Sequence, residues 1–179
     1  MGKGLFLGVP TLERRKIEFD ERFAPGSLDL ADWTFPEDIR TAGSAALLDQ
    51  KGSRTIRVKG AIAGDIEGLC GRCLENFREK VEGPFELYYY PAEGFSGEED
   101  RAISGEDANI GFYEESGLPL ADVVQEQIAL WLPIRGLCRD DCKGICQQCG
   151  VNRNKTSCSC EESSTDHRWE ALKSLKLDR

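Results

Sequence analysis

Eight cysteines constrain this chain more than any other feature of its sequence. They occur as four close pairs: Cys70 and Cys73, Cys138 and Cys142, Cys146 and Cys149, and Cys158 and Cys160. Two cysteines this close in sequence can turn back onto one ion, and zinc takes four ligands in a tetrahedral arrangement. Four pairs supply two complete four-thiolate sites with no cysteine left over. We therefore predict that all eight cysteines are ligands of two structural zinc ions.

The order of the pairs allows two ways of combining them into sites. Cys146, Cys149, Cys158 and Cys160 lie within fifteen residues and can form a local knuckle. Cys138 and Cys142 would then join Cys70 and Cys73, which ties the tail to the preceding fold. The alternative groups the four cysteines of residues 138–149 and leaves the first pair with the last. We favour the first arrangement because it closes the shorter loop, and the second stays open.

Other uses of cysteine fit this sequence less well. Disulfides are typical of secreted proteins, and the apolar stretch Leu5–Val9 is too short and glycine-broken for a signal peptide. A thioredoxin-like role for the first pair needs a βαβ context that the sequence lacks. An iron–sulfur cluster also takes four cysteines, although the spacings differ from its usual runs. His167 is the only histidine, and an exposed position in a helix first turn suits it better than a ligand role.

The rest of the chain predicts an α+β fold. Period-two patterns predict strands in residues 12–23, Thr55–Ile66 and Phe77–Tyr90, with a loop over 24–43. We also expect strands in the short apolar run Ala45–Asp49 and in Asn109–Glu114. Tight turns between the strands favour an antiparallel β meander or open barrel. Apolar residues at helical spacing predict a packed amphipathic helix over Pro119–Leu132, and Asp166 begins a final helix. We divide the chain into a β-rich core domain, 1–135, and a cysteine-rich zinc-knuckle module with that helix, 136–179.

The charge and the motifs of the chain limit the classes of function that we expect for it. The chain carries a net charge of −9, and residues 91–126 contain ten acidic residues against one basic residue. This acidity disfavours nonspecific binding to a polyanion. No segment approaches the roughly 20 apolar residues that span a bilayer, so we expect a cytoplasmic protein. A glycine-rich phosphate loop, G-x-S-x-G and H-E-x-x-H are all missing, so we predict no catalytic residue and no small-molecule substrate.

The order of motifs resembles the YceD family, the large ribosomal RNA subunit accumulation proteins. The specific residues are Cys70-Gly71-Arg72-Cys73-Leu74, the stretch Leu120–Pro133, Cys138-x3-Cys142-Lys143-Gly144-Ile145-Cys146-x2-Cys149-Gly150, Cys158-x-Cys160 and Asp166-x-Arg168-Trp169-x-x-Leu172. The resemblance runs from about residue 15 to the end. Some members carry histidines where Cys138 and Cys142 stand, which suits a site shared with the first pair. His167 and Pro119 depart from the family pattern at helix starts.

The resemblance implies a bacterial or plastid, non-enzymatic factor that supports 23S rRNA synthesis, processing or stability in large-subunit assembly. Its partner would be ribosomal RNA, a large-subunit ribosomal protein or an assembly factor. Basic residues of the tail would then face RNA phosphates: Arg135, Arg139, Lys143, Arg153 and Lys155. An alternative explanation, which the sequence favours equally, is that these basic residues offset the charge of two four-thiolate zinc sites, about −4 in total. Two other functions stay open: a protein-binding adaptor that uses the acidic segment 91–126, and a divalent-metal nuclease.

Overall fold

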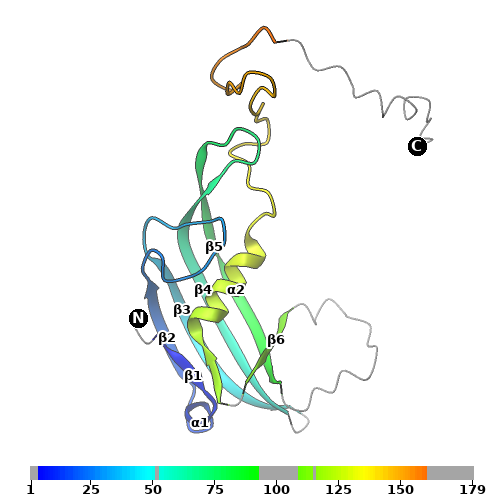
Figure 1. Ribbon diagram of the computed structural model, residues 1–179. Coiled ribbons are helices and arrows are strands. Elements are labelled where there is room, and N and C mark those ends of the chain that lie inside the picture. The colour runs from blue at the N-terminus through cyan, green and yellow to red at the C-terminus, as the bar shows by residue number, and fades with distance from the viewer. Residues whose placement is uncertain (1–3, 51–52, 93–108, 115, 161–179) are drawn as a thin grey trace, which may run out of the picture.

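The computed structural model describes residues 4–50, 53–92, 109–114 and 116–160. Its elements are β1 (Phe6–Gly8), α1 (Val9–Leu12), β2 (Ile17–Phe23), β3 (Ile39–Gln50), β4 (Ser53–Leu69), β5 (Asn76–Pro91), β6 (Ile110–Tyr113), β7 (Gly117–Pro119) and α2 (Leu120–Trp131). Strands β2 to β6 form one sheet, and β1 pairs with β7 in a second, two-stranded sheet (Figure 1). Within these ranges no helix has both the length and the apolar character that a membrane span needs.

The main sheet is open, with strand order β2-β3-β4-β5-β6, so that β2 and β6 are its edges. Its first four strands pair antiparallel, which confirms the predicted meander. The prediction of an all-antiparallel sheet was wrong for its last strand, because β6 runs parallel to β5. A parallel pair needs a connection of a dozen or more residues, and residues 92–109 provide that length.

Two predicted strand boundaries were wrong. Strand β2 begins at Ile17 rather than at residue 12, because residues 9–12 form the short helix α1. Strand β3 begins at Ile39, inside the predicted loop. Its inward positions include Thr41, which is buried and donates its hydroxyl to the Ala61 carbonyl at 3.2 Å. Gly43, the next inward position, lies against the backbone of β4. Because these two inward positions hold a polar residue and a glycine, the alternation of apolar and polar residues that identifies a strand is interrupted there.

The β4–β5 hairpin is longer than the strands beside it. β3 pairs with β4 only as far as Ala63, whereas β5 continues along β4 to Leu69. The end of the hairpin therefore projects beyond the sheet (Figure 1). The turn at this end contains Cys70 and Cys73, so the hairpin holds the first cysteine pair away from the core.

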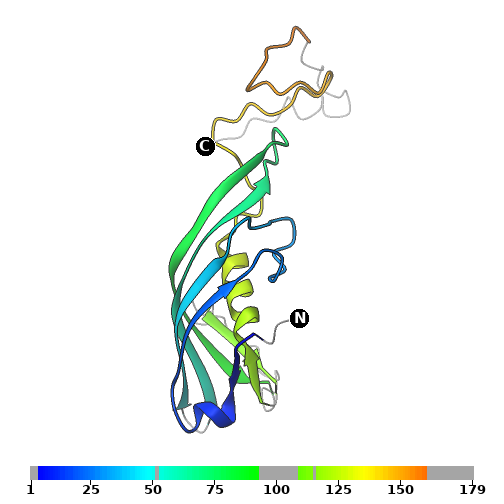
Figure 2. The ribbon, with the colours of Figure 1, turned by 90° about the vertical axis from the view of Figure 1, so that its left-hand side faces the viewer.

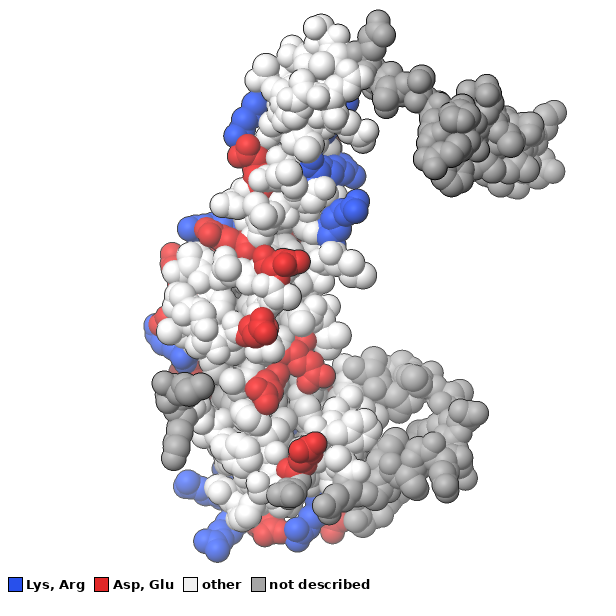
Figure 3. Space-filling model, viewed as in Figure 1, with Lys and Arg blue, Asp and Glu red and all other residues white. Residues whose placement is uncertain are grey.

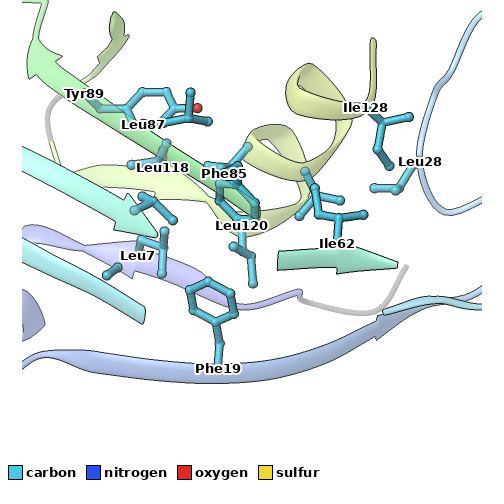
Figure 4. Packing of buried hydrophobic residues seen from close by; sticks show 14 of the residues in the cluster. Leu7, Phe19, Leu28, Ile62, Phe85, Leu87, Tyr89, Leu118, Leu120 and Ile128 are labelled. Atoms are coloured by element: carbon cyan, nitrogen blue, oxygen red, sulfur yellow. The ribbon is translucent and has the colours of Figure 1, made fainter. Parts of the chain in front are cut away.

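Helix α2 covers one face of the sheet (Figure 2). It confirms the predicted amphipathic helix, with Pro119 as N-cap and Leu132 as C-cap. Val123, Val124 and Ile128 are fully buried, as is Ile62 of β4 (Figure 4). Full burial of one such side chain contributes about 1.5–3 kcal/mol, so this layer anchors the helix. The division at residue 135 stays a prediction, and α2 leads the chain directly from the core toward the tail cysteines.

Candidate metal centre

The structure brings the eight cysteines together as two groups of four. We call Cys70, Cys73, Cys138 and Cys142 the inner tetrad, and Cys146, Cys149, Cys158 and Cys160 the outer tetrad; in each, the four sulfur atoms lie within 4.8 Å of one another. This is the grouping that loop closure favours. The inner tetrad joins the tip of the β4–β5 hairpin to the chain after α2, and the outer tetrad is formed entirely by the tail (Figure 1).

Sulfur–sulfur distances in the inner tetrad fit one tetrahedral ion. The Sγ atoms of Cys70 and Cys142 are 3.8 Å apart, and those of Cys73 and Cys138 are 3.7 Å apart. Zinc–sulfur bonds of about 2.3 Å in a tetrahedron place the sulfurs about 3.8 Å from one another. A disulfide needs about 2.05 Å between its sulfur atoms. The tetrad is thus spaced for a shared metal and not for two disulfides.

The two tetrads differ in burial. Cys70, Cys73 and Cys142 are buried, and Cys138 is the most exposed member of the inner tetrad. In the outer tetrad Cys149 is exposed and the other three are half-buried. Partly buried Phe77 and Leu137 pack against the inner tetrad. Because solvent reaches the inner tetrad less easily, we expect a metal ion bound there to exchange more slowly than one bound at the outer tetrad.

Backbone N–H groups favour the ionised form of Cys70 in the inner tetrad. Burial is the largest influence on Cys70 and would raise its pKa, but the backbone N–H groups of Cys138, Cys73 and Arg72 lower the pKa to about 6. Burial and the neighbouring sulfurs raise the pKa of Cys138 to about 12. The pKa of Cys142 is also lowered and that of Cys73 is raised, so Cys70 and Cys142 ionise more readily while Cys73 and Cys138 resist ionisation. A bound cation removes that resistance, since a coordinating thiol is deprotonated.

The outer tetrad repeats this arrangement. The backbone N–H groups of Cys149 and Gln148, together with the Cys149 thiol, lower the pKa of Cys146 to about 6. The neighbouring Cys149 thiol and burial raise the pKa of Cys160 to about 12. Each tetrad therefore combines a thiol that ionises easily with two thiols whose raised pKa makes their ionisation depend on the metal.

Asn154 connects the two tetrads, and the sequence patterns did not identify it. Its Nδ2 donates to the Sγ atom of Cys142 at 3.2 Å. Its Oδ1 accepts the Lys143 backbone N–H at 2.8 Å and Arg139 Nη2, also at 2.8 Å. One side chain from the loop of the outer tetrad thus touches an inner-tetrad sulfur and fixes the chain beside it. Hydrogen bonds of this kind orient metal ligands and tune their basicity.

The hairpin turn is also bound to the tail through its backbone. The Gly71 N–H donates to the Gly136 carbonyl at 2.9 Å, and the Ile145 N–H donates to the Arg72 carbonyl at 3.0 Å. The guanidinium of Arg72 donates to the carbonyls of Asp140, at 2.8 Å, and Cys142, at 3.1 Å. A methyl group at Gly71 would lie 2.8 Å from Cγ of Arg135, so any side chain there would displace the Arg135 side chain.

Four of the five basic residues predicted to face RNA lie in the cysteine-rich module, and Arg135 directly precedes it. Arg139 pairs with Asp141 at 3.3 Å, and Lys155 pairs with Glu75 at 2.8 Å. Arg135 packs over Gly71, and the Arg153 backbone N–H donates to the Gly144 carbonyl at 2.9 Å. Lys143 is exposed. Arg139 and Lys155 are thus each paired with an acidic side chain.

Other predicted features lie outside the described residues. They are residues 93–108, which hold six of the acids in the predicted acidic segment, and residues 161–179, which contain His167 and the predicted final helix from Asp166.

Comparison with known proteins links this arrangement to a family. The sequence model described as "Large ribosomal RNA subunit accumulation protein YceD" matches residues 58–176, a range that includes both tetrads. An uncharacterized protein of Mycobacterium tuberculosis (strain ATCC 25618 / H37Rv) is 33% identical over 102 residues, covering 55% of this chain and 45% of the relative.

A second relative has an informative name. The "Large ribosomal RNA subunit accumulation protein YCED homolog 1, chloroplastic" of Arabidopsis thaliana is 25% identical over 163 residues, covering 79% of this chain and 50% of the relative. The chain thus spans about half the length of these curated relatives. No solved structure matches it.

Proposed function

Because the chain belongs to the YceD family of large ribosomal RNA subunit accumulation proteins, we propose that it is a non-enzymatic, zinc-binding factor in ribosome biogenesis. It supports 23S rRNA synthesis, processing or stability during large-subunit assembly, and it acts in the cytoplasm. The observation that carries this proposal is the inner tetrad, which falls within the family match and links the core sheet to the tail.

The proposed zinc ions are structural. A closed site of four protein ligands leaves no open position for water or substrate, and each tetrad supplies four thiols. The buried hydrophobic cluster around the inner tetrad consists of its own cysteines with Phe77 and Leu137. Small modules of this kind derive their folding free energy from the bound metal. Metal binding at Cys70, Cys73, Cys138 and Cys142 would therefore hold the tail on the hairpin.

We assign two roles to the five basic residues in this function. Arg139 and Lys155 stabilise the module through Asp141 and Glu75. Arg135 and Lys143 are exposed, and we propose that they contact RNA phosphates together with Arg153. Phosphate contacts of this type position a protein on RNA without reading its sequence. Lys and Arg side chains lie on both sides of the upper part of the molecule (Figure 3).

The test is depletion of the protein in the organism that encodes it, followed by measurement of mature 23S rRNA relative to 16S rRNA. We expect the ratio to fall, and wild-type protein to restore it. The Cys70→Ser/Cys73→Ser variant should fail to restore it, whereas the matched surface variant Ser44→Ala should succeed. An unchanged ratio after depletion, with neither ribosomal RNA nor large-subunit proteins recovered by crosslinking, would sink the proposal.

A second candidate function is a protein-binding adaptor for a basic large-subunit protein. Acidic side chains lie along the face that α2 covers (Figure 3), where the helix contributes Asp122 and Glu126. Such a surface steers a basic partner toward it. Salt-sensitive capture of a ribosomal protein, lost in Asp122→Asn/Glu126→Gln and kept in Arg135→Ala/Lys143→Ala, would favour this function over RNA contact.

The nuclease alternative rests on acids outside the described residues. Incubation of the pure protein with rRNA and Mg²⁺ tests it. We expect no cleavage; cleavage abolished by Glu98→Ala, Glu99→Ala and Asp100→Ala would make the protein an enzyme.

A further inference from the structure

Most of one edge of strand β5 has no partner strand in the part of the chain that the structure describes. β4 pairs with one side of β5 over residues 76–89, whereas β6 pairs with the other side only over residues 88–91. Figure 1 shows β6 beside the lower part of β5 alone. Along residues 76–87 this second edge is therefore free within the described ranges. A free edge of this length is where an extended polypeptide can join a sheet as a further strand.

Pro84 shows which residues of β5 turn their backbone groups toward this free edge. It is the register partner of Ala61 on β4. Because proline has no N–H, these two residues cannot exchange a pair of backbone hydrogen bonds. In an antiparallel ladder, pairs that exchange such bonds alternate with pairs that do not. Lys80 and Glu82 therefore also direct their N–H and C=O groups away from β4, where an added strand could bind them.

A groove lies beside this free edge, between β5 and the end of α2. It has a volume of about 270 Å³ and is lined by residues 79–84 and 131–133. The lining includes Val81, which is buried, and Gly83, where an added Cβ would lie 3.3 Å from Cη2 of Trp131. The groove thus offers an apolar surface to a side chain of the strand that would pair with β5.

The side of α2 that faces β5 carries carboxylates. Oε2 of Glu126 accepts the Tyr89 hydroxyl of β5 at 3.0 Å. Burial, the Glu126 carboxylate and the Asp122 carboxylate raise the pKa of Tyr89. Within the described ranges neither acid forms an ion pair. Helix α2 therefore lines the lower part of the β5 edge with two negative charges that no base offsets.

Negative charge also prevails in the groove itself. Glu79 lines it, is exposed and has no ion pair among the described residues. Lys80 is the one base among the lining residues, and it pairs with Glu82. The bases that lie nearest to the groove in sequence have contacts elsewhere, Arg78 with Glu67 and Arg135 against Gly71. The edge and its groove are therefore acidic.

This charge distinguishes between the possible occupants of the groove. A nucleic acid would bring phosphates against carboxylates. A second copy of this chain, joined through the same edge, would bring the same unpaired carboxylates against one another. A basic polypeptide in extended conformation would instead place its cations beside these carboxylates, while its backbone binds that of Lys80 and Glu82. The observations therefore favour a basic polypeptide.

We propose that the free edge of β5 binds an extended, basic polypeptide segment as an added strand, with an apolar side chain against Trp131 and cationic side chains beside Glu79 and Glu126. In this mode of recognition main-chain hydrogen bonds supply affinity, and contacts of alternate side chains supply specificity. The inference deepens the adaptor function proposed above and rests on it, because it assigns the contact with a basic partner to one edge and one groove.

The test is fluorescence anisotropy of the labelled peptide Lys-Thr-Val-Thr-Lys-Thr-Val-Thr-Lys with the metal-loaded full chain. In a strand this peptide has lysine and valine on one face and threonine on the other. Lys80→Pro and Lys80→Ala both remove the lysine side chain, but only proline removes the N–H at the free edge. Lys80→Pro should weaken binding about tenfold or more, because the added strand loses a hydrogen bond and meets the proline ring. Lys80→Ala should bind at least as tightly as the wild type.

Charge variants test the second part of the inference. Glu79→Gln/Glu126→Gln should weaken binding of the peptide, most clearly at low salt. The matched change Glu18→Gln removes an exposed acid from β2 and should leave binding unchanged. Circular dichroism and metal content check that each variant folds.

Backbone methylation of the peptide gives a readout on the wild-type protein. Only alternate N–H groups of an added strand point toward its neighbour. Methylation of the lysine and valine nitrogens and methylation of the threonine nitrogens should therefore differ, with one set abolishing binding and the other retaining it. Equal effects of the two sets would overturn the inference.

Three other outcomes would also overturn it. The first is equal affinity of Lys80→Pro and Lys80→Ala for the peptide. The second is binding of single-stranded RNA instead of the peptide, lost in Lys80→Pro. The third is a wild-type dimer that Lys80→Pro dissociates, since a second copy would then occupy the edge. Capture of a ribosomal protein that Asp122→Asn/Glu126→Gln abolishes and Lys80→Pro retains would keep the adaptor function without this edge, so the two failures are distinguishable.

Discussion

Leu74 and Gly150 occupy equivalent positions in two matching turns, one in each tetrad. The Leu74 N–H donates to the Cys70 carbonyl, and the Gly150 N–H donates to the Cys146 carbonyl, both at 2.9 Å. Both residues have positive φ, 59° for Leu74 and 73° for Gly150. Each follows a C-x2-C pair, so hairpin and tail use the same knuckle. Only the tail uses the residue that adopts this conformation without strain.

We predict that Leu74→Gly stabilises the protein. A left-handed conformation costs a residue with a side chain about 1–2 kcal/mol, and glycine adds about 0.5–1 kcal/mol of unfolded-state entropy. The Leu74 side chain is 60% exposed, so little packing is lost. The expected gain is about 0.5–1 kcal/mol in the free energy of unfolding, measured by denaturant titration of the metal-loaded protein. The matched change Gly150→Ala should destabilise the tail; a loss in Leu74→Gly would refute this explanation.

Asn154→Ala should loosen the inner tetrad although Asn154 is not a ligand. The substitution removes the hydrogen bond to Cys142 and the two that Oδ1 accepts. Loss of partners around a metal site typically lowers affinity 10- to 100-fold. Competition with a chromophoric chelator measures this change. Thr156→Ala, an exposed neighbour, serves as the control, and equal affinities in the two variants would show that Asn154 has no such part.

Cys70→Ser and Cys158→Ser should differ in effect. Cys70 is fully buried at the hairpin tip and Cys158 lies in the outer tetrad. Cys70→Ser should shift the thermal unfolding of the whole chain, whereas Cys158→Ser should leave the sheet transition in place and expose the tail to protease. Circular dichroism melting and limited proteolysis distinguish them. Equal destabilisation by both changes would count against the division into a clamp and a local knuckle.

Metal affinity should rise with pH. In the inner tetrad the pKa values of Cys73 and Cys138 are raised, that of Cys138 to about 12, so both thiols are protonated at neutral pH without metal. The loaded site binds fewer protons, and its stability is therefore lost as pH falls. Release of at least these two protons predicts a decrease of about 100-fold or more in affinity per pH unit. Chelator competition between pH 6.5 and 7.5 measures it; a pH-independent affinity would contradict a thiolate site.

The sequence predicted the cysteine grouping because loop closure depends on spacing alone. It also predicted α2 and β5 closely, since apolar residues keep helical spacing along α2 and alternate over Phe85, Leu87 and Tyr89 of β5. The start of β3 was missed because Thr41 and Gly43 interrupt that periodicity. Asn154 and Arg72 were missed for another reason: their partners, Cys142 and Asp140, are brought close by the fold. Arg72 and Asp140 are separated by 68 positions, and no local pattern records such a contact.

The pairing of β6 with β5 shows the same limit. The alternation of residues 85–89 predicted the strand β5, but the parallel register of β6 decides that Phe112 joins Tyr90. The five basic residues were predicted as one group, as RNA contacts that the family resemblance implies. Their separate roles emerged only with the contacts of Arg139 and Lys155.

The most direct test of the two-zinc account is native mass spectrometry with elemental analysis of the purified chain. We predict two zinc ions per chain, with one lost in Cys146→Ser/Cys149→Ser and the other lost in Cys138→Ser/Cys142→Ser. The first variant should keep the inner ion and the second the outer ion. A metal-free chain with disulfides, an iron cluster, or loss of both ions in the Cys146→Ser/Cys149→Ser variant would contradict two separate structural zinc sites.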